Sequence, residues 1–166
     1  IAELTNGQIL RANFETIDGV RQGACWLAHQ RVGSAYHIQF GPSGTLYVGM
    51  TNRGWGGLAP GSGIARITYK GILPLEMKSG HLLENGFEMT FTKPLSIAPT
   101  VTGEKYDYNW WWEYGSPIQN LEDLQIQSVS LSNDGLTATV AIQNLEAGKC
   151  IMLKLQDVIG VDGSQL

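Results

Sequence analysis

Apolar and polar residues alternate with a period of two along much of the chain. In the first half, the alternation covers residues 36–40 and 46–50, and Gly41-Pro42-Ser43-Gly44 lies between them. This arrangement predicts a β-hairpin, because alternate residues of a strand face opposite sides of a sheet, and Gly and Pro favour turns. The same alternation predicts further strands at residues 20–26 and 65–69.

The second half of the chain alternates in the same way. We expect strands at residues 87–91, 136–142 and 151–155. The apolar positions change parity between residues 124–126 and 129–131, which predicts a β-bulge or a bend. The regular spacing of turns is typical of a β-sandwich, and no long amphipathic helix is evident.

The chain is therefore predicted to be all-β and to consist of two parts. Residues 1–70 are expected to form a Gly-rich β-meander like a propeller blade, and residues 71–166 an antiparallel β-sandwich. The composition fits this class, because 21 of 166 residues are Gly and 16% are charged.

The charge of the chain excludes some partners. The formal net charge is −4, and the 11 Lys and Arg residues are scattered singly. Nucleic acids and anionic membranes both need clustered basic charge, so neither is expected as a partner. No apolar run approaches the roughly 18 residues of a membrane span, so no membrane insertion is expected. Because the first residue is Ile1 and not Met, we expect the chain to be part of a larger protein.

Cysteine and histidine give little indication of a metal or redox site. Cys25 and Cys150 could form a disulfide or could be two buried thiols, and the sequence leaves both alternatives open. There is no CxxC motif, and the three histidines lack the spacing of metal ligands. We therefore expect no metal and no cofactor.

The most unusual segment is residues 106–114, with the sequence YDYNWWWEY. As a strand it would have one wholly aromatic face, while the opposite face would carry Asp107, Asn109, Trp111 and Glu113. The aromatic face could form the core of the sandwich. Alternatively, Trp111 could be an exposed platform on which a sugar ring stacks, with the three polar residues as partners for its hydroxyl groups. The two interpretations are compatible, since a strand has two faces.

A second candidate is the Gly-rich loop at residues 51–57, which carries Arg53 and Trp55. It could be a structural turn in which Trp55 covers the end of the sheet. It could instead face a ligand, with Arg53 binding the carboxylate or sulfate of an acidic sugar. The glycines do not form a phosphate-binding motif, and no GxSxG motif is present. We therefore expect no catalytic activity.

Several segments together resemble a known family. They are QGAC (22–25), GPSGTLYVGMTNRGWG (41–56), GFEMTFTKP (86–94) and YGSP (114–117), of which GMTNRGWG is the most specific. From about Gln8 to Leu166, the chain resembles the C-terminal region of secreted bacterial sugar- or sorbosone-dehydrogenase-like β-propeller proteins. The resemblance implies that the first part is like the end of a propeller and the second like an immunoglobulin-type sandwich. The catalytic and cofactor residues of such proteins would lie upstream, and no motif here matches them.

Two functions are consistent with these observations. The first is a non-catalytic module of an exported multidomain protein, secreted or periplasmic, that binds a poly- or oligosaccharide by aromatic stacking. It would bind through Trp111, Asn109, Glu113 and Asp107, with Trp55 and Arg53 as a second contact. The alternative is a structural C-terminal fragment of a dehydrogenase-like propeller protein, with no ligand of its own.

Overall fold

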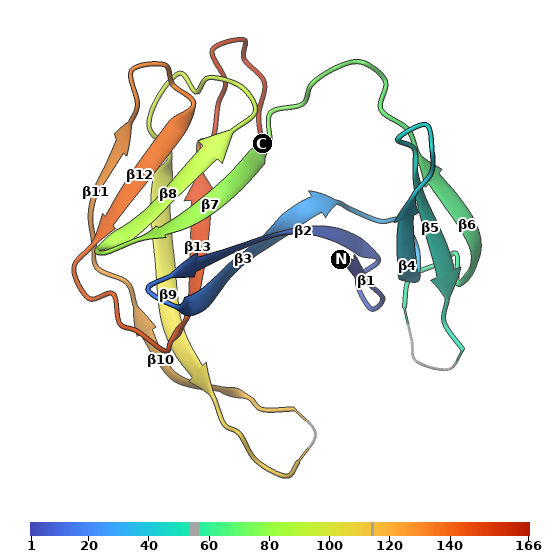
Figure 1. Ribbon diagram of the computed structural model, residues 1–166, viewed down its shortest axis with the longest axis horizontal. Coiled ribbons are helices and arrows are strands. Elements are labelled where there is room, and N and C mark those ends of the chain that lie inside the picture. The colour runs from blue at the N-terminus through green and yellow to red at the C-terminus, as the bar shows by residue number, and fades with distance from the viewer. Residues whose placement is uncertain (54–56, 114) are drawn as a thin grey trace. The chain divides into compact units, whose positions relative to one another are not determined.

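The computed structural model describes residues 1–53, 57–113 and 115–166. Every regular element in these residues is a β-strand, and the strands form four antiparallel sheets (Figure 1). The described residues contain no helix that could cross a membrane. The predicted all-β, antiparallel class is confirmed. The chain divides into two units, unit 1 (Ile1–Leu73) and unit 2 (Pro74–Leu166).

Unit 1 contains two three-stranded sheets. One consists of β1 (Ala2–Glu3), β2 (Gln8–Ile17) and β3 (Val20–His29), and the other of β4 (Ala35–Phe40), β5 (Leu46–Thr51) and β6 (Ser62–Ile67). Strands β4 and β5 form the hairpin that the alternating pattern predicts at residues 36–40 and 46–50. Gly44 in its turn has a φ of 77°, a left-handed conformation that glycine adopts without steric cost.

The core of unit 1 is small. Its buried apolar residues are Ile9, Val32, Ala35 and Val48. Val48 is fully buried and pairs with Ile38 and Ala65 on the neighbouring strands, so one face of the sheet covers this core. Large apolar side chains elsewhere in unit 1 remain exposed, among them Phe14, Tyr36, Phe40 and Ile64.

Unit 2 is a β-sandwich of two sheets. One sheet has the order β11 (Ile126–Leu131), β12 (Thr137–Ile142), β8 (Gly86–Phe91), β7 (Met77–Leu83), and the other has the order β10 (Ile118–Asp123), β9 (Thr100–Tyr108), β13 (Cys150–Gln156). The order β7-β8-β12-β11 corresponds to strands A, B, E and D of an immunoglobulin sandwich, and β13-β9-β10 corresponds to F, C and C′.

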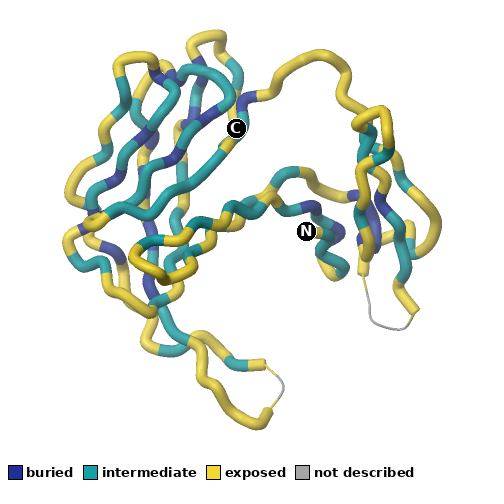
Figure 2. The backbone as a smooth tube through the Cα atoms, in the orientation of Figure 1, coloured by how far each residue is buried: buried dark blue, intermediate teal, exposed yellow. Residues whose placement is uncertain are grey.

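The two sheets of unit 2 enclose one apolar core. Alternate residues of β12, Ala138, Val140 and Ile142, are at most 2% exposed and lie in one core cluster with Phe91 and Val101. Buried positions recur along strands of the sandwich, separated by less buried ones (Figure 2). The predicted bulge is confirmed in β11, where the register shifts between Ile126 and Ser128.

Candidate functional site

The hairpin formed by β9 and β10 extends beyond the rest of the sandwich (Figure 1). We call residues 106–119 at its end the tryptophan arm. Strand β9 ends at Tyr108, so the strand expected over residues 106–114 is wrong beyond this point. Pairing with β13 ends at Tyr106–Cys150, and beyond it the described residues of β9 pair with β10 alone. The backbone N–H of Asn109 donates to Ser116 Oγ at 2.9 Å and not to a strand partner.

The three consecutive tryptophans are on the surface of the arm. Trp110 is 103% exposed, Trp112 is 91% exposed and Trp111 is 42% exposed. The interpretation of Trp110 and Trp112 as core residues is therefore wrong. The physical reason is that β9 pairs with β13 only as far as Tyr106, so among the described residues of unit 2 the sandwich does not continue alongside Trp110 and Trp112. The residues facing the core on β9 are instead Val101, Gly103 and Lys105.

Trp111 is held within the arm by its own side chain. Its indole N–H donates to the carbonyl oxygen of Gly115 at 2.5 Å, which closes the tip across four residues. Gly115 has a φ of 81°, so the reversal of the chain uses a left-handed conformation that glycine adopts freely. Trp111 thus shapes the tip, while the rings of Trp110 and Trp112 are free to meet a ligand.

An open cavity of about 340 Å³ lies beside these tryptophans. Three of the residues predicted for sugar binding, Trp111, Asn109 and Glu113, line it together. The other described residues of the lining are Tyr108, Trp110, Gly115 and Ser116. The cavity therefore combines aromatic rings with one amide and one carboxylate, the groups that stacking and hydroxyl recognition require.

An apolar stripe leads from the sheet to this cavity. Tyr106 and Tyr108 face the same side of β9 and contact each other edge to face, with ring centroids 5.5 Å apart. Ile118 of β10 pairs directly with Tyr108 and is also exposed. Burial is the main cause that raises the pKa of Tyr106. A hydrogen bond with the hydroxyl of Tyr108 raises it further.

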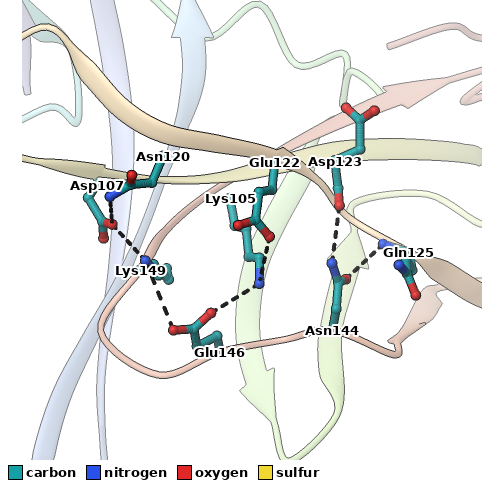
Figure 3. Close-up of polar contacts among 9 residues, drawn as sticks. All are labelled: Lys105, Asp107, Asn120, Glu122, Asp123, Gln125, Asn144, Glu146 and Lys149. Carbon is teal, nitrogen blue, oxygen red and sulfur yellow. Dashed lines mark hydrogen bonds and ion pairs between the residues drawn. The ribbon is translucent and has the colours of Figure 1, made fainter.

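Asp107, also predicted to bind sugar, is not among the described residues that line the cavity. Its Oδ2 accepts from Lys149 Nζ at 2.6 Å and from Asn120 Nδ2 at 3.0 Å (Figure 3). Lys149, followed by Asn120, holds the pKa of Asp107 below its usual value of 3.8. Asn120 lies where the register of β10 shifts, and its φ is 50°. Asp107 therefore fixes the base of the arm and does not face a ligand in the cavity.

A second cation continues this network on the core side of β9. Lys105 is 7% exposed and forms ion pairs with Glu146 at 3.0 Å and Glu122 at 3.2 Å. Glu146 also lies 4.0 Å from Lys149, which connects the two lysines (Figure 3). The hydrogen bond that Lys105 donates to Glu146 is the main cause that raises the pKa of Lys105, against the opposing effect of desolvation. The network joins β9, β10 and the loop before β13.

The second predicted contact belongs to unit 1. Arg53 is exposed in the loop after β5, and Trp55 lies outside the described residues. The cavity lining named above contains neither residue. The acidic-sugar contact expected from Arg53 therefore has no counterpart in the described lining of the arm.

Cys25 and Cys150 are free and exposed, so neither a disulfide nor a pair of buried thiols is observed. Within residues 1–53, 57–113 and 115–166, no group of three or more His, Cys, Asp or Glu residues is placed to hold a metal ion.

Comparisons with protein-family models, curated proteins and solved structures found no match to this chain.

Sequence reasoning missed the exposure of Trp110 and Trp112 and the roles of Lys149 and Glu146. One signal was available for the tryptophans, because the Gly115-Ser116-Pro117 turn follows them closely and favours a loop tip over a long strand. The two ion-pair partners of the arm come from a loop about 40 positions later in the chain, as their sequence separations of 41 and 42 show. Such a pairing is decided by the fold and not by local sequence.

Proposed function

We propose that the chain is a non-catalytic carbohydrate-binding module that binds a poly- or oligosaccharide through the tryptophan arm. The observation that carries the proposal is the exposure of Trp110 and Trp112 at the tip of a projecting hairpin. A large aromatic ring left in water at a loop tip stabilises no core, so a binding role accounts for it best. The module would belong to an exported multidomain protein, secreted or periplasmic.

The chemistry of the cavity suits a sugar. The C–H faces of a pyranose ring are apolar and can stack on an indole ring. The hydroxyl groups around that ring need donors and acceptors, and Asn109 and Glu113 supply both at the cavity wall. The indole N–H of Trp111 donates to the carbonyl oxygen of Gly115, and this bond joins two other residues of the cavity lining.

A binding role is favoured over hydrolysis by the carboxylates of the arm. Most glycosidases use a pair of carboxyl groups on either side of the scissile bond. Among the described residues of the cavity lining, Glu113 is the one carboxylate. The nearby Asp107 is engaged by Lys149 and Asn120.

The test is affinity electrophoresis of the full chain against a panel of neutral and acidic polysaccharides, followed by calorimetry. Trp110→Ala and Trp112→Ala are each expected to weaken binding about tenfold, since an aromatic contact contributes up to about 1.5 kcal/mol. Tyr69→Ala is the matched control, because Tyr69 is an aromatic residue of unit 1 that is 67% exposed. Unchanged retention of both Trp variants would contradict the proposal.

Trp111 needs a separate pair of variants. Trp111→Ala is expected to weaken binding while leaving the sandwich folded, and Trp111→Phe retains a ring but loses the donor to Gly115. If Trp111→Ala unfolds unit 2, the arm is part of the core and the proposal is wrong.

A structural role without a ligand is the second candidate function. It is favoured by unit 1, where Phe14, Tyr36, Phe40 and Ile64 are each more than two-thirds exposed, at 69% to 76%. Such side chains are typical of a surface that is covered in a larger protein. Failure of a folded sample to bind any polysaccharide of the panel would favour this alternative.

A further inference from the structure

The two units differ strongly in charge. Unit 1 has six Lys or Arg residues against three Asp or Glu residues, a formal charge of +3. Unit 2 has five lysines, no arginine and twelve Asp or Glu residues, a formal charge of −7. The overall charge of −4 therefore conceals an acidic unit, and this is the unit that carries the tryptophan arm.

The lysines of unit 2 do not offer a free positive site at the arm. Four of them form ion pairs: Lys93 with Asp162, Lys105 with both Glu122 and Glu146, Lys149 with Asp107, and Lys154 with Glu104. The fifth, Lys78, lies on β7 in the opposite sheet. A ligand carboxylate that approached Lys105 or Lys149 would have to displace an existing carboxylate at 2.6–3.2 Å.

The cavity itself carries one charge among its described residues, the carboxylate of Glu113. A uronic acid or a sulfated sugar in this cavity would bring a second negative charge close to the first. Like charges brought together in a binding site disfavour the complex, and they do so most at low ionic strength. A neutral sugar does not meet this opposition, and its hydroxyl groups can donate to the same carboxylate.

We propose that the tryptophan arm selects a neutral glycan chain and excludes uronic acids and sulfated sugars, with Glu113 as the residue that enforces the exclusion. This inference rests on the proposed carbohydrate-binding function and specifies its ligand class. The Glu113 carboxylate then has two effects. It accepts hydrogen bonds from the hydroxyl groups of a neutral sugar, and it repels a negatively charged sugar.

The experiment compares polysaccharides that share a backbone and differ in charge. Calorimetry of the full chain would use hydroxyethylcellulose with carboxymethylcellulose, methyl-esterified with de-esterified homogalacturonan, and dextran with dextran sulfate. We expect binding to the neutral member of at least one pair, about tenfold or more stronger than to its anionic counterpart at low salt. The difference is expected to shrink as salt is added.

Variants then separate Glu113 from the general charge of unit 2. Glu113→Lys is expected to raise the affinity for the anionic polymer about fivefold, and Glu113→Gln by less. Asp157→Asn is the matched control for Glu113→Gln, because it removes one negative charge elsewhere. The side chain of Asp157 accepts a hydrogen bond from Thr100, the first residue of β9, which is about 20 Å of strand away from the start of the arm at Tyr106. It should leave the discrimination unchanged.

Each outcome has a distinct meaning. Equal or stronger binding to an anionic polymer overturns the inference but leaves the proposed function standing. An unchanged preference in Glu113→Lys overturns the role of Glu113. No binding to any of the six polymers by a folded sample overturns both proposals. Binding to phosphatidylcholine vesicles in the absence of any polysaccharide binding also overturns both, and identifies a membrane surface as the partner of the tryptophans.

Discussion

The two units place their large apolar side chains differently. In the described residues of unit 2, ten apolar residues from the two sheets and the segments that join them are buried in one cluster, and the most exposed aromatic rings belong to the arm. In unit 1, four apolar residues are buried, while exposed apolar side chains occur on β2, β4 and β6. Two facing sheets can enclose a core, whereas small three-stranded sheets leave much apolar surface in water.

This difference shows in which unit an exposed apolar side chain indicates a binding site. On unit 1, exposed apolar residues are spread over several strands, as expected of a surface with a small core beneath it. On unit 2, the exposed apolar residues of the strands are Tyr108, Ile118 and Leu121, at 46% to 55%, and Trp110 and Trp112 are far more exposed than these. The tryptophans are therefore the better indicator of a site.

The largest expected effect is the difference in stability loss between two Phe→Ala variants, one in each unit. Phe91 is 3% exposed and Phe14 is 71% exposed. Phe91→Ala should lower the free energy of unfolding of unit 2 by about 3–5 kcal/mol, because it leaves a cavity in the core. Phe14→Ala should cost about 1 kcal/mol or less, since it removes only the cross-strand contact with Gly23.

Urea unfolding followed by hydrogen-exchange mass spectrometry would assign each loss to its unit. Equal losses in the two variants would show that the hairpin of β2 and β3 is as tightly packed as the sandwich. That result would remove the contrast between the units.

An intermediate effect is expected from acid at the base of the arm. The pKa of Asp107 is lowered in the folded protein by Lys149, so its contribution to stability is present above its usual pKa of 3.8. The contribution is lost as the pH falls below this value toward the lower pKa of the folded state. Protection of the amides in residues 105–122 against hydrogen exchange, relative to their intrinsic exchange rates at each pH, should therefore fall below about pH 4.

Asp107→Asn provides the control for this pH dependence. The amide oxygen can still accept from Lys149 and Asn120, but it does not titrate. The variant should lose the part of the acid response that is specific to the arm, while the sheet β7-β8-β12-β11 responds as in the parent. An unaltered acid response would show that Asp107 does not control the arm.

The smallest effect on stability is expected at the most exposed ring. Trp112→Ala should change the free energy of unfolding of unit 2 by no more than about 0.5 kcal/mol, because the side chain is 91% exposed. Thermal unfolding followed by circular dichroism would measure the change. A loss of several kcal/mol would mean that the arm is buried in solution, and would end the contrast between the arm and the core.

Much of the sandwich was predictable from the alternating pattern. The strands at 87–91, 136–142 and 151–155 match β8, β12 and β13, and the change of parity marked the bulge in β11. These segments are half-buried, so each residue's polarity reports which face it occupies. Strand β7, with the sequence MKSGHLL, lacks that alternation and was missed.

The candidate site was predictable only in part. Trp111, Asn109 and Glu113 were selected from the alternating pattern of residues 106–114, and all three line the cavity. The assignment of Trp110 and Trp112 to a buried face failed, because alternation shows two faces without showing whether a second sheet covers either. Asp107 was chosen as a ligand residue, and its pairing with Lys149 depends on a loop distant in sequence.

The sequence by itself determined the all-β class, most strand positions and the residue types that gather at the arm. These depend on local alternation and turn residues, which act within a few positions along the chain. The end of β9 at Tyr108 and the exposure of the tryptophans depend on the tertiary structure. The same is true of the ion pairs of Asp107 with Lys149 and of Lys105 with Glu122 and Glu146. Burial and ion pairing depend on which segments meet in space, and in a Greek-key sandwich those segments lie far apart in the chain.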